Sequence, residues 1–87
     1  MWTIHLTKEA GKDAKRLKEA GLDAKAKFLL AIIRENPYQN PPPYEKLQGC
    51  NPPEYSRRIN IKHRLHYMVV EESKTIYIFH MWSHYGE

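Results

Sequence analysis

The sequence predicts an α+β domain in which a short strand and a two-helix hairpin are followed by a three-stranded antiparallel meander. Apolar residues alternate with polar ones before residue 7 and after residue 54, whereas between residues 8 and 35 they recur at helical spacing. The turns of the second half are short, which requires antiparallel hairpins. Because 87 residues suffice for one core only, we expect one domain over residues 1–87. Its helices should pack on one face of a twisted antiparallel sheet.

The first part of the chain is expected to form a strand and then the helical hairpin. Residues 2–6 alternate large apolar and polar types, and Thr7 has the side chain of a helix N-cap. The first helical pattern covers residues 8–19, Gly21 interrupts it, and the second covers about residues 22–35. Helices joined by so short a connection form an antiparallel hairpin.

A long connection precedes the meander. Residues 36–53 are rich in proline, asparagine and tyrosine, a composition that forbids helix interiors and central strands but favours a stiff, ordered loop. Three strands are then expected, over residues 55–61, 64–70 and 75–83, joined by short polar turns. The helices cover one face of this sheet, so the other face is available for function.

Alternation along the strands predicts which side chains lie on that open face. Arg64 and His66 should lie there, because Leu65 and Tyr67 between and after them carry the apolar pattern of the core. Arg58 shares the open face with Arg64 if the hairpin register permits. Guanidinium groups present a planar fork of donors that matches phosphate oxygens, so the two arginines indicate a phosphate site.

The chain also carries candidates for proton transfer. In the last strand, alternation groups His80, Trp82 and His84 on one face, and an imidazole with its ordinary pKa of about 6.5 can donate a proton near neutral pH. Glu45 is the one plausible base in the stiff loop, because a carboxylate near arginines can accept a proton from a ribose hydroxyl.

The charge balance favours a polyanionic partner. With 14 lysines and arginines against 10 acidic residues, the formal net charge is +4. Each basic side chain that meets a phosphate releases condensed counterions, which favours nucleic acid. Composition alone leaves an acidic protein as an alternative partner.

Cysteine usage and hydropathy narrow the setting. Cys50 is the only cysteine, so the chain can form neither an internal disulfide nor a cysteine-based zinc site. The five histidines form no compact ligand motif, and we expect no metal and no cofactor. No apolar run approaches the ~18 residues needed to span a bilayer, and the start of the chain lacks a secretion-signal pattern. These features predict a cytoplasmic protein that does not engage the membrane.

Several segments together resemble the YoeB branch of the RelE/ParE toxins. They are Glu45, the run Tyr-Ser-Arg-Arg-Ile at 55–59, the run His-Arg-Leu-His-Tyr at 63–67, and the pair His84-Tyr85. They occur in the same order as in that family and extend over nearly the whole chain. The resemblance implies a fold related to small microbial ribonucleases and an activity as a metal-independent messenger RNA endonuclease that works on the ribosome.

The resemblance also implies roles for individual residues. Glu45 matches the general base, Arg64 the arginine that stabilises the transition state, His84 the general acid, and Tyr85 a residue that positions the substrate. Arg58 matches a phosphate-binding arginine of the family, and we expect Arg57 and Lys46 to bind phosphate as well.

Partners follow from the same resemblance. It implies a YefM-like antitoxin, contact with messenger RNA in the A site of the ribosome, operator DNA binding only through the antitoxin complex, and a chain that is compatible with a homodimer. Two other functions remain open at this point. One is a ParE-like gyrase inhibitor of the same fold, and the other is an RNA-binding module that stacks bases on Trp82 and Tyr85.

Overall fold

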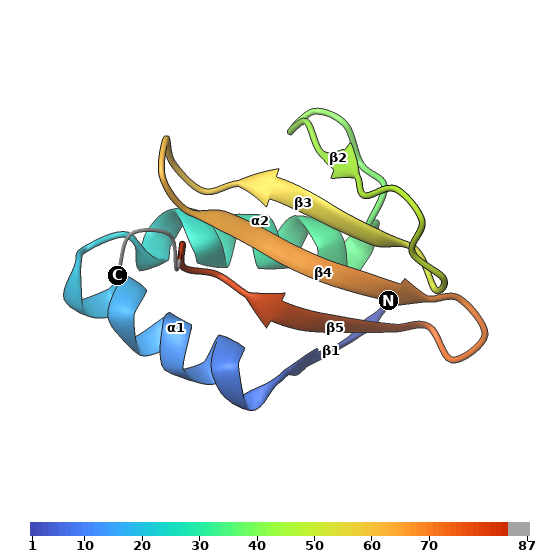
Figure 1. Cartoon of the computed structure of the whole chain (residues 1–87), viewed down its shortest axis with the longest axis horizontal. Helices are drawn as coiled ribbons and strands as arrows, with labels where there is room; N and C mark the ends of the chain where they lie inside the picture. The colour runs from blue at the N-terminus through green and yellow to red at the C-terminus, as the bar shows by residue number, and fades with distance from the viewer. Residues whose placement is uncertain (84–87) are drawn as a thin grey trace.

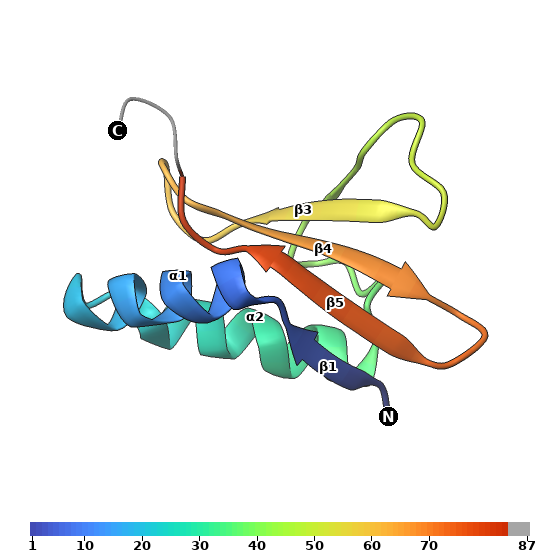
Figure 2. The same ribbon diagram turned by 60° about the horizontal axis from the view of Figure 1, so that its bottom comes forward.

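The computed structural model describes residues 1–83, in which two helices pack against one face of a five-stranded sheet (Figure 1). The second view shows both helices on the same side of the sheet and the opposite face open (Figure 2). In chain order the elements are β1 (Thr3–Leu6), α1 (Lys8–Glu19), α2 (Asp23–Glu35), β2 (Glu45–Lys46), β3 (Glu54–Arg58), β4 (Arg64–Val70) and β5 (Thr75–His80). The strand order across the sheet is β1-β5-β4-β3-β2. The α+β class and the placement of the helices are therefore as the sequence predicts.

Both helices begin and end close to where the sequence predicts. Thr7 caps α1, because its hydroxyl accepts a hydrogen bond from the Ala10 N–H at 3.2 Å. The same hydroxyl donates to the Phe79 carbonyl at 3.2 Å, which ties the start of α1 to β5. Between the helices Gly21 has a φ of 72°, a left-handed conformation that glycine adopts without steric cost. Neither helix of the described part of the chain is long and apolar enough to cross a membrane.

The meander of β3, β4 and β5 is antiparallel, as expected. However, β1 pairs with β5 in the parallel direction, so the expectation of a wholly antiparallel sheet was wrong and the sheet is mixed. The helical hairpin separates β1 from the meander and allows β1 to lie at the sheet edge, running alongside β5 (Figure 1). Antiparallel pairing follows from short connections, and no short connection joins these two strands.

The strands at the other edge also depart from the expectation. Residues 45–46 form the two-residue strand β2, within a segment expected to be loop throughout, and pair antiparallel with β3. β3 ends at Arg58 and β5 at His80, three residues earlier than predicted in each case. A bulge between His66 and Tyr67 changes the register of β4 against β5. Such a bulge bends the strand locally, which alternation in the sequence does not show.

The core lies between the sheet and the helices. The predicted core residues Leu65, Tyr67 and Val69 are fully buried, and so are Leu29 and Ile33 of α2. Burying a large apolar side chain contributes about 1.5–3 kcal/mol. This core fixes the face of the meander that points inward, and therefore the face on which Arg64 and His66 lie.

The loop between α2 and β3 is held from inside by Arg57. Its side chain is fully buried, and its guanidinium donates to the carbonyls of Pro37 at 3.1 Å, Gln39 at 2.8 Å and Pro42 at 2.6 Å. Its Nε donates to the Tyr67 hydroxyl at 3.0 Å. These bonds fix the course of the loop just before it reaches β2.

Candidate active site

One row of paired residues crosses the open face of the sheet. Glu45 of β2 pairs with Ser56 of β3, Ser56 pairs with His66 of β4, and His66 pairs with His80 of β5. In the neighbouring row Arg58 pairs with Arg64. Side chains of paired residues lie on the same face. The register therefore gathers carboxylate, arginine and histidine side chains from positions far apart in the sequence.

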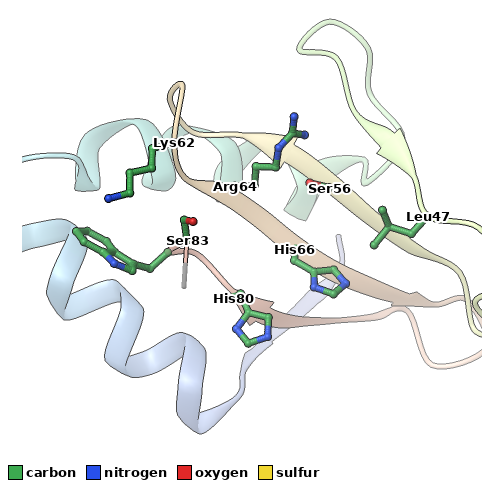
Figure 3. Close-up of a pocket in the computed structure, with 8 residues that line it drawn as sticks. Leu47, Ser56, Lys62, Arg64, His66, His80 and Ser83 are labelled. Carbon is green, nitrogen blue, oxygen red and sulfur yellow. The ribbon is translucent and has the colours of Figure 1, made fainter. Parts of the chain in front are cut away.

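Two hollows lie over these rows. The larger, which we call the groove, has a volume of about 440 Å³ and is lined by Leu47, Ser56, Lys62, Arg64, His66, His80, Trp82 and Ser83 (Figure 3). The smaller has a volume of about 200 Å³ and is lined by Pro43, Tyr44, Glu45, Ser56, Arg58 and Arg64. Because Ser56 and Arg64 line both, the two hollows are continuous parts of one site.

Glu45 and Arg64 form an ion pair in the smaller hollow. The distance from Arg64 Nη1 to Glu45 Oε1 is 3.4 Å, and the two side chains are 42% and 69% exposed. A pair so open to water contributes at most about 1 kcal/mol to stability. Both groups can therefore turn toward a ligand at small cost. A carboxylate can accept a proton there, while the guanidinium binds an adjacent phosphate oxygen.

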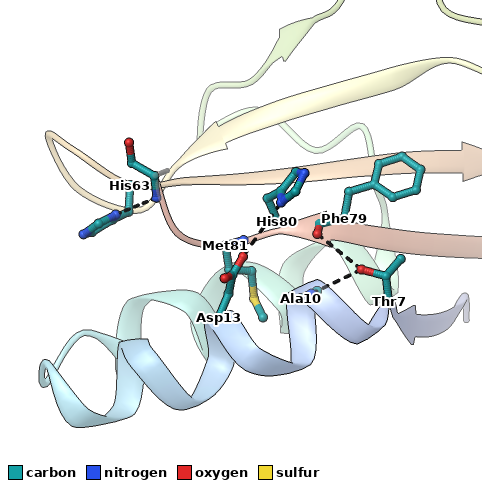
Figure 4. Close-up of polar contacts among 8 residues, drawn as sticks. Thr7, Ala10, Asp13, His63, Phe79, His80 and Met81 are labelled. Atoms are coloured by element: carbon teal, nitrogen blue, oxygen red, sulfur yellow. Dashed lines mark hydrogen bonds and ion pairs between the residues drawn. The ribbon is translucent and has the colours of Figure 1, made fainter. Parts of the chain in front are cut away.

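The histidines of the groove each have a carboxylate partner. His66 Nε2 lies 2.8 Å from Glu54 Oε1, and His80 Nδ1 lies 4.0 Å from Oδ2 of Asp13, a fully buried residue of α1. Asp13 also accepts a hydrogen bond from the Met81 N–H at 3.0 Å, which fixes the end of β5 against α1 (Figure 4). The two imidazole rings are stacked with centroids 5.9 Å apart.

The far end of the groove is built by an aromatic stack. The His63 and Trp82 rings are stacked with centroids 4.0 Å apart and an angle of 26° between their planes, and His63 Nδ1 accepts a hydrogen bond from the Ser83 N–H at 2.9 Å. His80 and Trp82 both line the groove, which confirms the shared face expected for these two residues, and Met81 between them is buried. The groove therefore offers an aromatic surface beside its basic side chains.

The structure brings some predicted site residues together and leaves others apart. Glu45, Arg58 and Arg64 line the same hollow. Lys46 is exposed and pairs with Tyr55, whose side chain points to the core, so alternation directs Lys46 away from Glu45. His84 and Tyr85 lie outside the described residues.

Arg57 does not lie at the site. The phosphate-binding position implied for it is contradicted by its complete burial and by the four hydrogen bonds of its guanidinium to the loop and to Tyr67. Its ring contact is with Tyr44, over which the guanidinium carbon lies at 4.9 Å from the centroid. Arg57 therefore has a structural role, and Arg58 is the arginine that points to the open face.

Sequence reasoning missed the two carboxylates behind the histidines. Alternation placed His66 on the open face, but Glu54 reaches it only because Ser56, two residues away on the same strand, pairs with His66. Asp13 comes from a helix more than 60 residues away from His80 in the chain. Within residues 1–83, no cluster of three or more histidine, cysteine or acidic side chains is arranged to hold a metal ion.

A two-helix hairpin on one face of a mixed sheet, with arginine and glutamate on the other, is the architecture of the small toxins of the RelE/ParE superfamily. The comparisons with known proteins agree. The family model described as the ParE toxin of the type II toxin-antitoxin system parDE matches residues 4–85, and the chain belongs to this family.

Several solved structures have a similar fold. YoeB from Staphylococcus aureus, in its heterotetrameric complex with YefM, is 31% identical and has a TM-score of 0.78, with 98% of this chain and 99% of that chain covered. A YoeB/ParE toxin from Agrobacterium tumefaciens is 22% identical with a TM-score of 0.81, covering 95% of this chain and 99% of the other. RelE from the RelE-RelB complex of Pyrococcus horikoshii is 19% identical with a TM-score of 0.79, covering 99% and 98%. No curated protein sequence matches significantly. The chain is thus a type II toxin of YoeB-like fold.

Proposed function

We propose that this toxin is a metal-independent endoribonuclease that cuts messenger RNA on the ribosome and so inhibits translation. One observation carries the proposal: Glu45, Arg58 and Arg64 line one hollow on the open face, with Glu45 and Arg64 in contact. These three side chains supply a base and two phosphate ligands at one place. The YoeB resemblance of the sequence supports the same activity.

The proposed reaction uses the 2′-hydroxyl of the RNA as its nucleophile. Glu45 takes the proton of this hydroxyl, the oxygen attacks the adjacent phosphorus, and Arg64 and Arg58 stabilise the charge that develops on the phosphorane. His84 gives a proton to the leaving 5′-oxygen, and Tyr85 positions the substrate. The upstream fragment then ends in a 2′,3′-cyclic phosphate. DNA lacks the nucleophile and is not cut.

The ribosome has a positional role in this proposal. Holding the reacting groups in the correct orientation lowers the activation free energy of the reaction. A codon fixed in the A site is therefore cut faster than free RNA. Lys46 follows Glu45 in the chain, but its exposed side chain is directed away from Glu45, so we infer for it only a peripheral contact with the RNA backbone or the ribosome. Action on translating ribosomes also implies a cytoplasmic location.

The partner implied for the toxin is an antitoxin. The S. aureus relative is in complex with YefM in one solved structure and is a dimer in another. We infer a YefM-like antitoxin whose acidic segment covers the basic open face of the toxin. In this complex the antitoxin, and not the toxin, would contact operator DNA. A homodimer of the free toxin is part of the same inference.

The deciding experiment maps messenger RNA ends by primer extension in a cell-free translation reaction, with and without the purified toxin, and again without ribosomes. New ends that require ribosomes support the proposal, and ends without ribosomes would make it a free ribonuclease. Glu45→Gln should abolish the new ends but leave antitoxin binding intact, as should His84→Gln. Glu72→Gln is the matched control, because Glu72 is an exposed turn carboxylate away from the site. Full cutting by Glu45→Gln would refute its role.

Gyrase inhibition is the second candidate, because the matching family model is that of ParE toxins. Such an inhibitor would leave messenger RNA intact and block supercoiling of plasmid DNA by purified gyrase. The Glu45, Arg58 and Arg64 cluster would then be dispensable. A supercoiling assay beside the primer-extension assay therefore separates the two candidates.

A further inference from the structure

The groove beside the proposed cutting site offers hydrogen-bond donors over most of its length. Among the described residues that line it, Lys62, Arg64, His66 and His80 carry nitrogen donors, and none is a carboxylate. Three carboxylates of residues 1–83 contact these lining side chains: Glu54 and Asp13 lie against the imidazoles, and Glu45 lies against Arg64. A cavity of about 440 Å³ with these donors fits an anion better than a cation.

His66 is held in one orientation by its surroundings. Its Nε2 lies 2.8 Å from Glu54 Oε1, and the two side chains are only 28% and 25% exposed. The Phe79 ring meets the imidazole edge-on, with centroids 5.3 Å apart at 69°. A carboxylate at one ring nitrogen fixes that nitrogen as the donor toward it and orients the ring. The other nitrogen, Nδ1, donates to an anion when the ring is in its imidazolium form. His66 is therefore preorganised, whereas an ordinary surface histidine would rotate freely.

His66 lies two residues after Arg64 on β4, on the same face of the strand. Two residues of a β-strand span about 6.7 Å, and both side chains are on the open face. Adjacent phosphates of an extended RNA strand can match such a step. Trp82, which lines the end of the groove and is backed by the buried His63 ring, adds an aromatic surface for a base.

We propose that the groove is a second phosphate subsite, in which His66 and His80 bind the phosphate next to the one that is cut. The proposal rests on the proposed function for the identity of the ligand as single-stranded RNA. It adds to that function that the toxin recognises an RNA segment through at least two neighbouring phosphates. Glu54 acts through His66 and is a positioning residue.

The test measures binding without cleavage. The probes are the 2′-O-methyl dinucleotide UpU and the same dinucleotide with a terminal 5′-phosphate or 3′-phosphate, none of which has the hydroxyl needed for cutting. Dissociation constants come from NMR titration of the whole toxin at one salt concentration. One of the two terminal phosphates should tighten binding about tenfold in the wild type, the effect of one hydrogen bond to a charged group.

The variants separate the imidazole from its carboxylate. His66→Leu alone would leave Glu54 facing the ligand, so the main variant is His66→Leu with Glu54→Gln, checked for folding by thermal unfolding. In this double variant the gain from the terminal phosphate should fall below about twofold. His5→Gln is the matched control, since His5 stacks on Tyr77 and does not line the groove. It should keep the whole gain.

The outcomes distinguish this subsite from the proposed cutting. If neither terminal phosphate tightens binding in the wild type, or if the double variant keeps the gain, the subsite is refuted even where messenger RNA is cut. If the gain is present and lost as expected while no messenger RNA ends appear, the subsite stands and the nuclease proposal fails.

Discussion

Replacing Arg57 by methionine should destabilise the fold severely, although the substitution lies at a position next to an exposed arginine. Methionine keeps most of the volume but removes all four hydrogen bonds of the guanidinium. The Pro37 carbonyl keeps a bond from the Tyr67 hydroxyl at 2.8 Å, whereas the carbonyls of Gln39 and Pro42 lose this donor. A buried acceptor left without a partner costs about 1–3 kcal/mol.

Two such carbonyls and the lost packing on Tyr44 give an expected loss of about 3 kcal/mol in the free energy of unfolding. For a domain of this size that loss lowers the melting temperature by about 12–24 °C. Urea unfolding followed by tryptophan fluorescence measures it directly, provided the denaturant dependence of the free energy is unchanged.

Arg58→Met is the matched control for Arg57→Met. Arg58 is exposed and adjacent in sequence, so its removal should change the free energy of unfolding by less than about 0.5 kcal/mol. It should instead slow messenger RNA cleavage. A loss below about 1 kcal/mol for Arg57→Met, or an equal loss for both variants, would refute the assignment of a structural role to Arg57.

Three further predictions concern other parts of the molecule. Thr7→Ala should cost about 1–2 kcal/mol in urea unfolding because it removes the N-cap of α1, whereas Thr7→Ser keeps the hydroxyl and should cost clearly less; equal losses would contradict the cap. Burial raises the pKa of Tyr38, Tyr55 and Tyr67 above the ordinary value of 10, and the hydrogen bond to Glu71 raises the pKa of Tyr38 further. The folded state therefore favours the neutral phenols. The stability that they contribute is present below pH 10 and is lost as the pH rises above 10. Urea midpoints measured from pH 9 to 11.5 should fall, and less so for Tyr38→Phe; a flat profile would contradict this. Arg64→Lys should slow cleavage by about 10²-fold or more, since lysine keeps the charge but lacks the planar fork, and a wild-type rate would show that charge alone suffices.

The sequence predicts the helices and strands better than it predicts which strands pair with one another. Helix bounds, the Thr7 cap and the inward face of β4 follow from local spacing and were confirmed. The parallel pairing of β1 with β5 and the two-residue strand β2 depend on contacts between distant segments, which no local pattern encodes. The candidate site was predicted where it depends on strand alternation, as for Arg64, and missed where it depends on register, as for Glu54.

Arg57 and Arg58 show why residue type alone was insufficient. Alternation placed them on opposite faces, but a charged residue on the inward face was still expected to meet phosphate. The loop above it contains three consecutive prolines, at 41–43, and proline has no N–H with which to satisfy neighbouring carbonyls. The carbonyls of this loop therefore need a donor from elsewhere, and the buried guanidinium supplies it.

The row that runs from Glu45 to His80 has a consequence for biosynthesis. Its members come from four strands, and β5, made last, joins β1 to the rest of the sheet. Until residue 80 has been synthesised, β1 has no neighbouring strand and the groove lacks the wall formed by His80 and Trp82. A chain terminated before β5 would hold Glu45, Ser56 and His66 of the row without His80, which completes the row. Completion of this row and of the groove is therefore a single late event in the synthesis of the chain.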